Sequence, residues 1–484
     1  MEKVIDKKNT NRNTNESDEF AERVINRSKQ MGASKSSDYI NLLQNKKYSK
    51  IYLTVKSKFF VGLTIASLWV GVSVFLADNW LEDLSSITNP ILAFIIIAGV
   101  AYVPGFMNAF LVGSLLMDKQ PKLQNVTKVK DSITILVSAF NEEQGIYNTL
   151  KYIKNQNYLG NIHVIVIDNN SDDNTSKEVL RAKEELEMDI LLLSEPNPGK
   201  FNSLNLGLKH VKTEYVITLD ADTLLHPKAV GYLVSRIKVS SRDVCAVAGS
   251  ILVRNSRDNL LAKIQEWDYF LSIASIKRMQ GLYQGTLVAQ GAFSLYKTKV
   301  VLNIGGWSDA IGEDIVLTWK MLAEGRKVYF EPHAVAFTDV PIKLSHFAKQ
   351  RSRWARGMIE GLREVKPWEQ PSLMAKFSTG IDFLIPYVDF SYTFFWIPGL
   401  ILALFFNNYA IVGPMMILVF PLTLISFWIL YRYQYSVVFK NLNLKVRKNY
   451  MGFIFFIFTY QMLMSPISLY GYVQELVGAK RVWK

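Results

Sequence analysis

The chain contains a single cysteine, Cys245, among its 484 residues. An intrachain disulfide is therefore impossible, and a metal site built from several cysteines is excluded. Acidic residues are also scarce relative to basic ones, since 42 Asp and Glu accompany 55 Lys and Arg and leave a net charge of +13. This surplus favours an anionic partner. Because the basic residues flank apolar segments, we expect a membrane surface and a nucleotide diphosphate and no nucleic acid.

The first 56 residues lack any hydrophobic run and are rich in Lys, Asn, Ser and Glu. This composition predicts a mostly disordered cytoplasmic tail, too long and too polar to begin a signal peptide. Two apolar runs, 59–77 and 90–117, then predict two transmembrane helices within residues 57–118, because each is close to the roughly 20 residues that cross a bilayer. The loop between them carries three acids and no Lys or Arg. Both flanks are basic and are predicted to be cytoplasmic.

Residues 130–366 have a different pattern, in which β-branched runs such as ITILVSA, HVIVID and YVITLDAD alternate with helical stretches. The alternation predicts an α/β domain inserted between transmembrane helices, with a mostly parallel sheet and helices on both of its faces. Ligands of such sheets bind at the carboxyl ends of the strands. Asn141, Asp168, Glu195 and Asp220 are expected at those ends.

Apolar runs return in residues 367–484 and predict about three further spans, at 387–406, 409–430 and 450–476. The basic loop between the last two is expected in the cytoplasm, with the α/β domain. Five spans would place the C-terminal tail outside, which its basic residues oppose. Residues 361–381 are expected to lie at the membrane interface. Asp389 is expected either to face a polar path through the membrane or to be a shallow interfacial acid.

Three groups of polar residues suggest chemistry. The acids of Asp220–Ala221–Asp222 follow an apolar strand, where the i, i+2 spacing suits one hard divalent cation that also holds phosphates. Glu313–Asp314 begins a helical run, EDIVLTWKMLAEG, where capping acids are the alternative interpretation. Gln350, Arg353 and Trp354 share one face of a predicted helix.

The order of these groups, with Asp168 before them and Q-x-x-R-W just ahead of a membrane block, resembles the processive glycosyltransferases of family 2. That family includes the cellulose, hyaluronan and poly-N-acetylglucosamine synthases. The resemblance covers about residue 59 to the C-terminus, and GEDIVLTWKMLAEGRKVYFEPHAVAF and QRSRWARG look most like the poly-β-1,6-N-acetylglucosamine synthases. It implies a GT-A-like fold and a UDP-sugar donor. Asp168–Asn169 stands where the family has two adjacent acids, and Asn170 replaces the usual Gly, which leaves open which side chain reads the base.

The resemblance implies donor, metal, catalytic and acceptor residues. The expected donor-binding residues are Ser138, Asn141, Glu142, Asp168, Asn169, Lys200, Asp220, Gln350 and Arg353. Asp220 and Asp222 are expected to hold Mg²⁺ or Mn²⁺, and a solvated lysine is the alternative for Lys200. Asp314 is the expected general base, with Glu313 beside it. Trp354 and Gly291 are expected on the acceptor side, although Trp354 as an aromatic anchor of an interface helix is the alternative.

The function expected from this resemblance is polymerisation of a UDP-sugar, UDP-N-acetylglucosamine in the first place, into a β-linked exopolysaccharide of the kind found in biofilms. The expected partners are the donor, the growing glycan and the bilayer, with or without a small membrane protein that assists export. Another β-glycan synthase, making hyaluronan, a chitin-like chain or a glucan, is an alternative. A lipid glycosyltransferase that adds one sugar is a second alternative, which Q-x-x-R-W disfavours. A non-catalytic scaffold or transporter would have no need for the acidic set.

Overall fold

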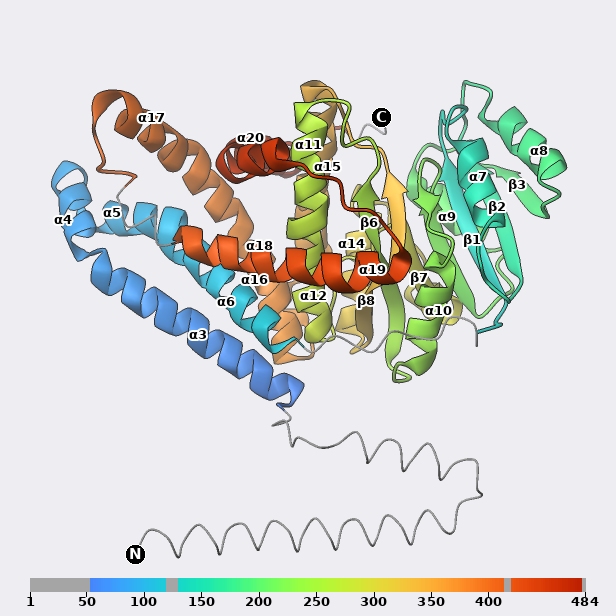
Figure 1. Cartoon of the computed structure of the whole chain (residues 1–484), viewed down its shortest axis with the longest axis horizontal. Coiled ribbons are helices and arrows are strands. Elements are labelled where there is room, and N and C mark those ends of the chain that lie inside the picture. The colour runs from blue at the N-terminus through green and yellow to red at the C-terminus, as the bar shows by residue number, and fades with distance from the viewer. Residues whose placement is uncertain (1–52, 119–128, 413–418, 481–484) are drawn as a thin grey trace, which may run out of the picture. The chain divides into compact units, whose positions relative to one another are not determined.

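The computed structural model describes residues 53–118, 129–412 and 419–480. The chain divides into two units, Met1–Thr54 and Val55–Lys484, and the features below all belong to the second unit. The predicted polar tail therefore lies almost wholly outside the described residues. Figure 1 shows the second unit as a twisted sheet with its own helices, joined to a group of long helices.

The sheet has eight strands in the spatial order β3-β2-β1-β4-β7-β6-β8-β5. The strands are β1 (Ile133–Ala139), β2 (Ile162–Asp168), β3 (Ile190–Ser194), β4 (Tyr215–Asp220), β5 (Leu224–Leu225), β6 (Val244–Val253), β7 (Phe293–Lys297) and β8 (Lys327–Thr338). The first four strands in this order are mutually parallel, and β6 is parallel to β8. β7 is antiparallel to both neighbours, as β5 is to β8. The predicted mostly parallel α/β sheet is confirmed.

Both faces of the sheet are covered, because successive side chains of a strand point to opposite faces. Ile133, Ile135 and Val137 of β1 pack into one core, whereas Leu136 packs into the other. The helices of the sheet domain that pack into the first core are α7 (Ile146–Lys154), α8 (Thr175–Glu185) and α10 (Ala229–Val239), and Leu430 and Tyr433 of a later apolar helix join them. Those of the second core are α9 (Lys200–Leu208), α13 (Thr298–Ile304) and α14 (Glu313–Ala323). The loops that leave the strands are thus held between two packed layers.

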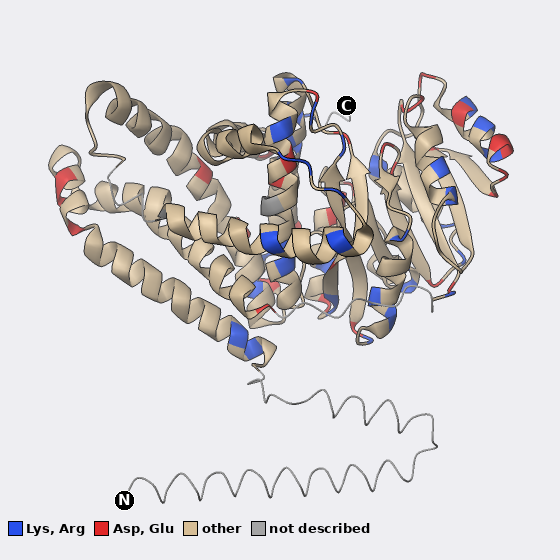
Figure 2. Cartoon of the chain, viewed as in Figure 1, with Lys and Arg blue, Asp and Glu red and all other residues tan. Residues whose placement is uncertain are grey.

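Four helices among the described residues are long and apolar enough to cross a membrane: Val55–Leu76, Pro90–Met117, Leu373–Phe406 and Tyr450–Leu476. They comprise α3 (Val55–Leu76), then α5 (Pro90–Ile97), η1 (Ala98–Tyr102) and α6 (Val103–Met117), then α16 (Leu373–Ser391), η5 (Tyr392–Trp396) and α17 (Ile397–Phe406), and α20 (Tyr450–Leu476). Figure 2 shows that charged residues are sparse on these helices and frequent on the sheet domain. This distribution is what a membrane region beside an aqueous domain requires.

The remaining elements join the long helices to one another or to the sheet domain. They are α4 (Asp78–Ile87), α11 (Leu260–Trp267), η3 (Asp268–Ile273), α12 (Ala274–Leu282), α15 (Leu344–Glu364), η4 (Pro367–Glu369), α18 (Val419–Tyr433), η7 (Gln434–Phe439) and α19 (Lys440–Leu442). The predicted span at 409–430 lies partly on residues 413–418, outside the described residues, and its described part forms most of α18.

Two expected segments have different boundaries in the structure. The apolar helix expected at 387–406 already begins at Leu373, so that residues 373–381 belong to it. The rest of the expected interface segment divides between the end of α15 and the short turn Pro367–Glu369. Pro367 lacks a backbone N–H and disfavours a helical conformation at the residue before it, which accounts for the break. A position at the membrane interface remains a prediction for this segment.

Candidate active site

The carboxyl ends of β1, β2 and β4 meet at one edge of the sheet, called here the donor edge. In the strand register Ser138 lies opposite Asp220 of β4, and Ala139 lies opposite Asp168 of β2. Asp168 is buried, whereas Ser138 and Asp220 are half-buried. The structure therefore brings together three residues that the sequence places on separate strands.

Lys200, at the start of α9, connects the donor edge to Glu313. Its ammonium forms an ion pair with Asp220 and lies 3.8 Å from Glu313 Oε1. Burial lowers the pKa of this ammonium, but the carboxylates of Asp220 and Glu313 outweigh burial and raise the pKa above its ordinary value. Gly199, just before it, has a φ of 131°, a conformation open to glycine. Lys200 is thus an internal member of the site and not a solvated lysine.

Glu313 is buried at the start of α14. Burial raises the pKa of its carboxyl to about 8; Lys200 lowers this pKa and Asp314 raises it. Because Asp220 takes the direct contact with Lys200, Glu313 is left at the longer distance from that cation. Glu313 is consequently a much weaker acid than an ordinary glutamate.

Asp314 is held by backbone groups and not by a cation. Its Oδ2 accepts a hydrogen bond from the N–H of Gly291 at 2.9 Å, and its Oδ1 accepts one from the N–H of Ile315 at 2.9 Å. A Cβ atom at Gly291 would lie 2.8 Å from Lys200 Nζ, so glycine is the residue that fits between Asp314 and Lys200. The expected base and the expected acceptor-side residue Gly291 are therefore direct neighbours.

Asp222 and Glu142 add negative charge beside Asp220. Burial, followed by the charge of Asp220, raises the pKa of Asp222 to about 6. Burial raises the pKa of Glu142 to about 7, with Asp222 and Asp220 as further causes. No group of three or more His, Cys, Asp or Glu among the described residues has a metal-binding arrangement. The carboxyl groups of Asp220 and Asp222 are oxygen ligands of the kind that a hard divalent cation prefers, and they would be the residues that hold one.

The turns after β1 and β2 are held by hydrogen bonds to side chains that were expected to bind the donor. Asn141, at a φ of 55°, accepts a hydrogen bond from the N–H of Asp172 at 2.8 Å. Asp168 accepts from the N–H of Ser171 at 3.0 Å and from the hydroxyl of Ser176. These contacts shape the two turns, and roles in reading the base remain predictions for Asn141 and Asp168.

Asn169 has a clear structural role. Its amide donates to the carbonyl groups of Glu195 and Asn197 at 3.0 and 2.6 Å, and its Oδ1 accepts from the N–H of Gly199 at 2.8 Å. This buried side chain therefore fixes the loop that presents Lys200. Donor contact remains a prediction for Asn169, whereas a positioning effect through this loop follows directly from the hydrogen bonds.

The Q-x-x-R-W residues lie on α15. Gln350 is half-buried and its Oε1 has no hydrogen-bond partner among the described residues. Arg353 is half-buried and forms no ion pair with a described residue. The Trp354 side chain is 40% exposed. All three therefore keep binding capacity for a ligand.

The sequence did not indicate which residues hold the Trp354 ring in place. The guanidinium of Arg351 lies 3.9 Å from the centre of the Trp354 ring and forms a 2.9 Å ion pair with Asp268 of η3. Arg351 and Asp268 are both buried. Arg351 stands inside the motif, but nothing in the sequence connects it to Asp268, 83 positions earlier.

Lys277 of α12 is a second residue that the motifs did not indicate. Burial lowers the pKa of its ammonium to about 7, an effect opposed by the negative charge of Asp314. Its amino group, which burial makes easier to deprotonate, therefore acts on Asp314 from a helix outside every quoted motif.

Close helix contacts set the distance between α14 and α15. A Cβ atom at Gly357 would lie 2.7 Å from the Cα atom of Gly312, and the N–H of Gly312 donates to Glu360 at 3.0 Å. On the other side of α15, Arg356 forms a buried 3.1 Å ion pair with Glu475 of α20. The helix α15, which carries the Q-x-x-R-W motif, is thus packed between α14, which carries Asp314, and α20, a helix of membrane-spanning length.

Asp389 lies in α16, within the apolar helix. It is buried and accepts hydrogen bonds from Ser465 Oγ at 2.7 Å and Tyr472 OH at 2.8 Å, both on α20. The hydroxyl groups near this acid therefore come from the neighbouring helix, which makes Asp389 a contact between α16 and α20.

The geometry defines an α/β domain in which Lys200 connects a strand-end acid to Glu313 of α14, and α14 packs against the basic helix α15. Residues 131–357 match the model of the family described as "Glycosyltransferase like family 2". A solved mannosyltransferase from Pyrobaculum calidifontis, described in complex with GDP-Man and Mn²⁺, aligns with a TM-score of 0.53 and 19% identity over 80% of this chain and 99% of that one. Residues 131–357 are thus similar to family 2 glycosyltransferase domains, and the domain has the GT-A-like fold.

Among curated proteins, the chain is similar to one particular group of glycosyltransferases. The chain is 34% identical over 273 residues to the poly-beta-1,6-N-acetyl-D-glucosamine synthase of Staphylococcus aureus strain COL. It is 32% identical over 271 residues to the enzyme of the same name from Staphylococcus epidermidis. Each match spans 54% of this chain and 65% of the relative. The predicted likeness to this group of glycosyltransferases is confirmed.

Proposed function

We propose that the chain is a membrane-embedded, inverting glycosyltransferase that polymerises N-acetylglucosamine from UDP-N-acetylglucosamine into a β-linked exopolysaccharide. The names of the curated relatives support the sugar. The main structural support is the position of Lys200, whose ammonium contacts Asp220 on the donor edge and lies 3.8 Å from Glu313, next to Asp314. The residues proposed to act on the leaving group and those proposed to act on the acceptor are thus adjacent.

Donor binding is assigned to the donor edge and to the motif helix. Ser138, Asn141, Glu142 and Asp168 would hold the nucleoside, while Lys200 and Arg353 offset the charge of the diphosphate. Arg353 suits this role because it has no carboxylate partner among the described residues. Gln350 has a free buried amide oxygen for the same ligand.

Asp220 and Asp222 would hold Mg²⁺ or Mn²⁺ between the protein and the diphosphate. The cation would supply neutralisation of the negative charge that develops on the departing UDP. The support for this assignment is the position of the two acids, two residues apart at the carboxyl end of β4, and the charge of Asp220 is, after burial, the second cause that raises the pKa of Asp222. The related fold that was solved with GDP-Man and Mn²⁺ accords with this assignment.

Asp314 is assigned as the base. Two backbone N–H groups fix its carboxylate, so that it can accept the proton of the acceptor hydroxyl as that oxygen attacks C1 from the face opposite UDP. A single displacement of this kind inverts the anomeric centre. Trp354, backed by Arg351, offers an apolar plane for the acceptor sugar.

The four apolar helices support a multi-pass protein of the cell membrane, with the transferase domain in the cytoplasm where nucleotide sugars are made. Export of the polymer by the same chain, with or without a small membrane partner, belongs to this proposal. Its support is that α15 packs directly against α20 through Arg356 and Glu475.

The function is tested by giving membranes that contain the full chain a panel of radiolabelled UDP-sugars. We expect label from UDP-N-acetylglucosamine in a long polymer that a β-hexosaminidase digests. Polymer made from UDP-glucose alone, or only in mixtures containing UDP-glucuronic acid, would identify a glucan or hyaluronan synthase. Label confined to an organic-soluble product with one sugar would identify a lipid glycosyltransferase.

Export is tested in sealed vesicles that contain the chain with its transferase domain outward. We expect polymer inside the vesicles, protected from added glycan hydrolase until detergent is added. Polymer that is wholly digested in intact vesicles would contradict export and leave a membrane-tethered transferase.

A further inference from the structure

A cavity of about 790 Å³ lies apart from the residues assigned to sugar transfer. Its walls come from the end of β6, the start of η3, the apolar helix α18 and the segment 444–450 that leads into α20. The lining is mainly apolar and aromatic, with Trp267, Phe270, Phe427, Trp428 and Tyr431 among its members. Its volume is that of a site for a small organic ligand.

The charged residues that line the cavity are mostly cations. Arg254 donates to Asp339 at 2.8 Å, and Glu266 forms a 2.8 Å ion pair with Arg257, so these two charges are already balanced. Lys445, Arg447 and Lys448 are exposed and form no ion pair with a described residue. The cavity therefore combines an apolar interior with three unbalanced positive charges at its rim.

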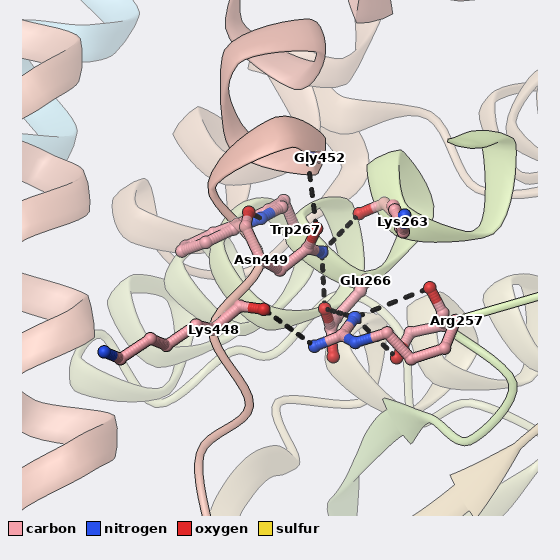
Figure 3. A network of polar contacts seen from close by, with 8 residues as sticks. Arg257, Lys263, Glu266, Trp267, Lys448, Asn449 and Gly452 are labelled. Atoms are coloured by element: carbon pink, nitrogen blue, oxygen red, sulfur yellow. Dashed lines mark hydrogen bonds and ion pairs between the residues drawn. The ribbon is translucent and has the colours of Figure 1, made fainter. Parts of the chain in front are cut away.

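The basic segment is held in place by its backbone and by Asn449, as Figure 3 shows. The indole of Trp267 donates to the carbonyl of Asn449 at 2.8 Å, and the amide of Asn449 donates to the carbonyl of Lys263 at 2.9 Å. Arg257 donates to the carbonyl of Lys448 at 3.4 Å. The side chains of Lys445, Arg447 and Lys448 are thus presented from an anchored backbone, and the wall of the cavity is preformed.

The neighbouring helix shows which kind of ligand has access. Trp428 of α18 is 60% exposed, and Leu424 and Tyr431 are also exposed. All three line the cavity, so the outer apolar surface of α18 continues into it. Aromatic residues beside Lys and Arg at the end of an apolar helix are typical of the boundary between acyl chains and headgroups.

We propose that this cavity is a binding site for an anionic phospholipid. The acyl part lies against the aromatic wall of α18 and η3, and the phosphate lies at Lys445, Arg447 and Lys448. A free phosphate or nucleotide would leave the apolar wall without a partner, and a zwitterionic lipid would leave the three cations unbalanced. The site is independent of the proposed transferase chemistry.

The test uses the full chain in phosphatidylcholine vesicles with spin-labelled phosphatidylglycerol or spin-labelled phosphatidylcholine as the probe. Electron paramagnetic resonance measures the immobilised fraction of each probe. We expect the wild-type chain to prefer phosphatidylglycerol by at least about fivefold, the effect of one cation near an anionic surface. Lys445→Ala/Arg447→Ala/Lys448→Ala should bring that preference close to one.

A matched control removes three basic residues near the starts of membrane helices that do not line the cavity. In Lys56→Ala/Lys58→Ala/Lys376→Ala the preference should remain. Trp428→Ala tests the apolar wall and should reduce immobilisation of both lipids. The altered residues are exposed except Lys58, which is half-buried, and circular dichroism checks that each variant is folded.

Four results would overturn the proposal. An unchanged lipid preference in the triple variant of Lys445, Arg447 and Lys448 would show that these cations do not bind the phosphate. An equal loss of preference in the control variant would show that basic residues attract anionic lipid generally, without a specific site. Displacement of the labelled lipid by millimolar glycerol 3-phosphate would identify a site for free phosphate. Displacement by N-acetylglucosamine oligomers would identify a glycan subsite.

Discussion

The donor edge and the motif helix α15 hold their charged residues in opposite ways. At the donor edge one ammonium, Lys200, is shared by Asp220 and Glu313, while Asp222 and Glu142 lie close enough to Asp220 for its charge to raise their pKa values, so acidic groups outnumber the paired cation there. On α15 the buried arginines have carboxylate partners, Asp268 and Glu475. Unbalanced charge suits the binding of a ligand that brings counter-charge, whereas balanced buried charge suits the fixing of a helix.

The largest effect is expected for Asp314→Asn, which keeps the size of the side chain and removes the proton acceptor. Polymer formation should fall by about a thousandfold, within the range for loss of a general base. The rate of labelled polymer synthesis measures this effect. Glu324→Gln, at the exposed far end of the same helix, is the control and should remain active. An Asp314→Asn enzyme with normal turnover would remove this residue from the chemistry.

The next effect is expected for Asp222→Asn at the donor edge. Transfer should fall by about a hundredfold or more, the loss typical of weakened charge stabilisation in the transition state. Asp172→Asn, an exposed acid in the neighbouring turn, should have little effect. The same assay in EDTA should abolish the activity of the wild-type enzyme, and full activity in EDTA would contradict the metal role.

Asp268→Asn alters one of the balanced buried pairs of α15 and should lower the stability of the protein. It leaves the Arg351 guanidinium buried without its carboxylate, a change that typically costs about 3 to 5 kcal/mol. Thermal unfolding in detergent measures the loss. Asp243→Asn breaks an exposed ion pair with Lys327 and should cost at most about 1 kcal/mol. Equal effects of the two variants would show that Arg351 does not depend on Asp268.

A smaller effect is expected for Gly357→Ala, where the new methyl group meets the backbone of Gly312. Overpacking of this kind typically costs about 1 to 3 kcal/mol and should move Asp314 relative to α15. Gly285→Ala is the matched control, because its nearest neighbour would lie at an ordinary 3.7 Å. A Gly357→Ala enzyme as stable and active as the control would show that the helices adjust freely.

The sequence predicted the donor edge because its signals are local. Short β-branched apolar runs define β1, β2 and β4, and parallel pairing then brings Ser138, Asp168 and Asp220 to one edge. The pairs Arg351–Asp268 and Arg356–Glu475 join distant segments. Only side-chain packing decides them, so no spacing could reveal them. Asn169 was understood only in part for the same reason, since its partners are mainly backbone atoms of a later loop.

The boundary of the third apolar helix was also beyond local reasoning. The run 373–386 mixes polar and apolar residues and includes Asp382, and such a segment is typical of a membrane interface as well as of a span. In the structure this run and the apolar residues after it form one helix. Asp389, just beyond the run, accepts hydrogen bonds from two side chains of α20. Asp389 was expected to face a polar path or to lie at the interface, and its burial against hydroxyl groups of α20 was not foreseen.

In the proposed mechanism the donor edge binds UDP while Asp314 acts only on the acceptor. Calorimetric titration of UDP with Mn²⁺ into Asp314→Asn and Asp222→Asn separates these two roles. We predict that Asp314→Asn binds UDP as tightly as the wild-type chain does, although it makes no polymer, and that Asp222→Asn loses the Mn²⁺-dependent part of the affinity. Loss of UDP affinity in Asp314→Asn, with normal turnover at saturating donor, would contradict the assignment.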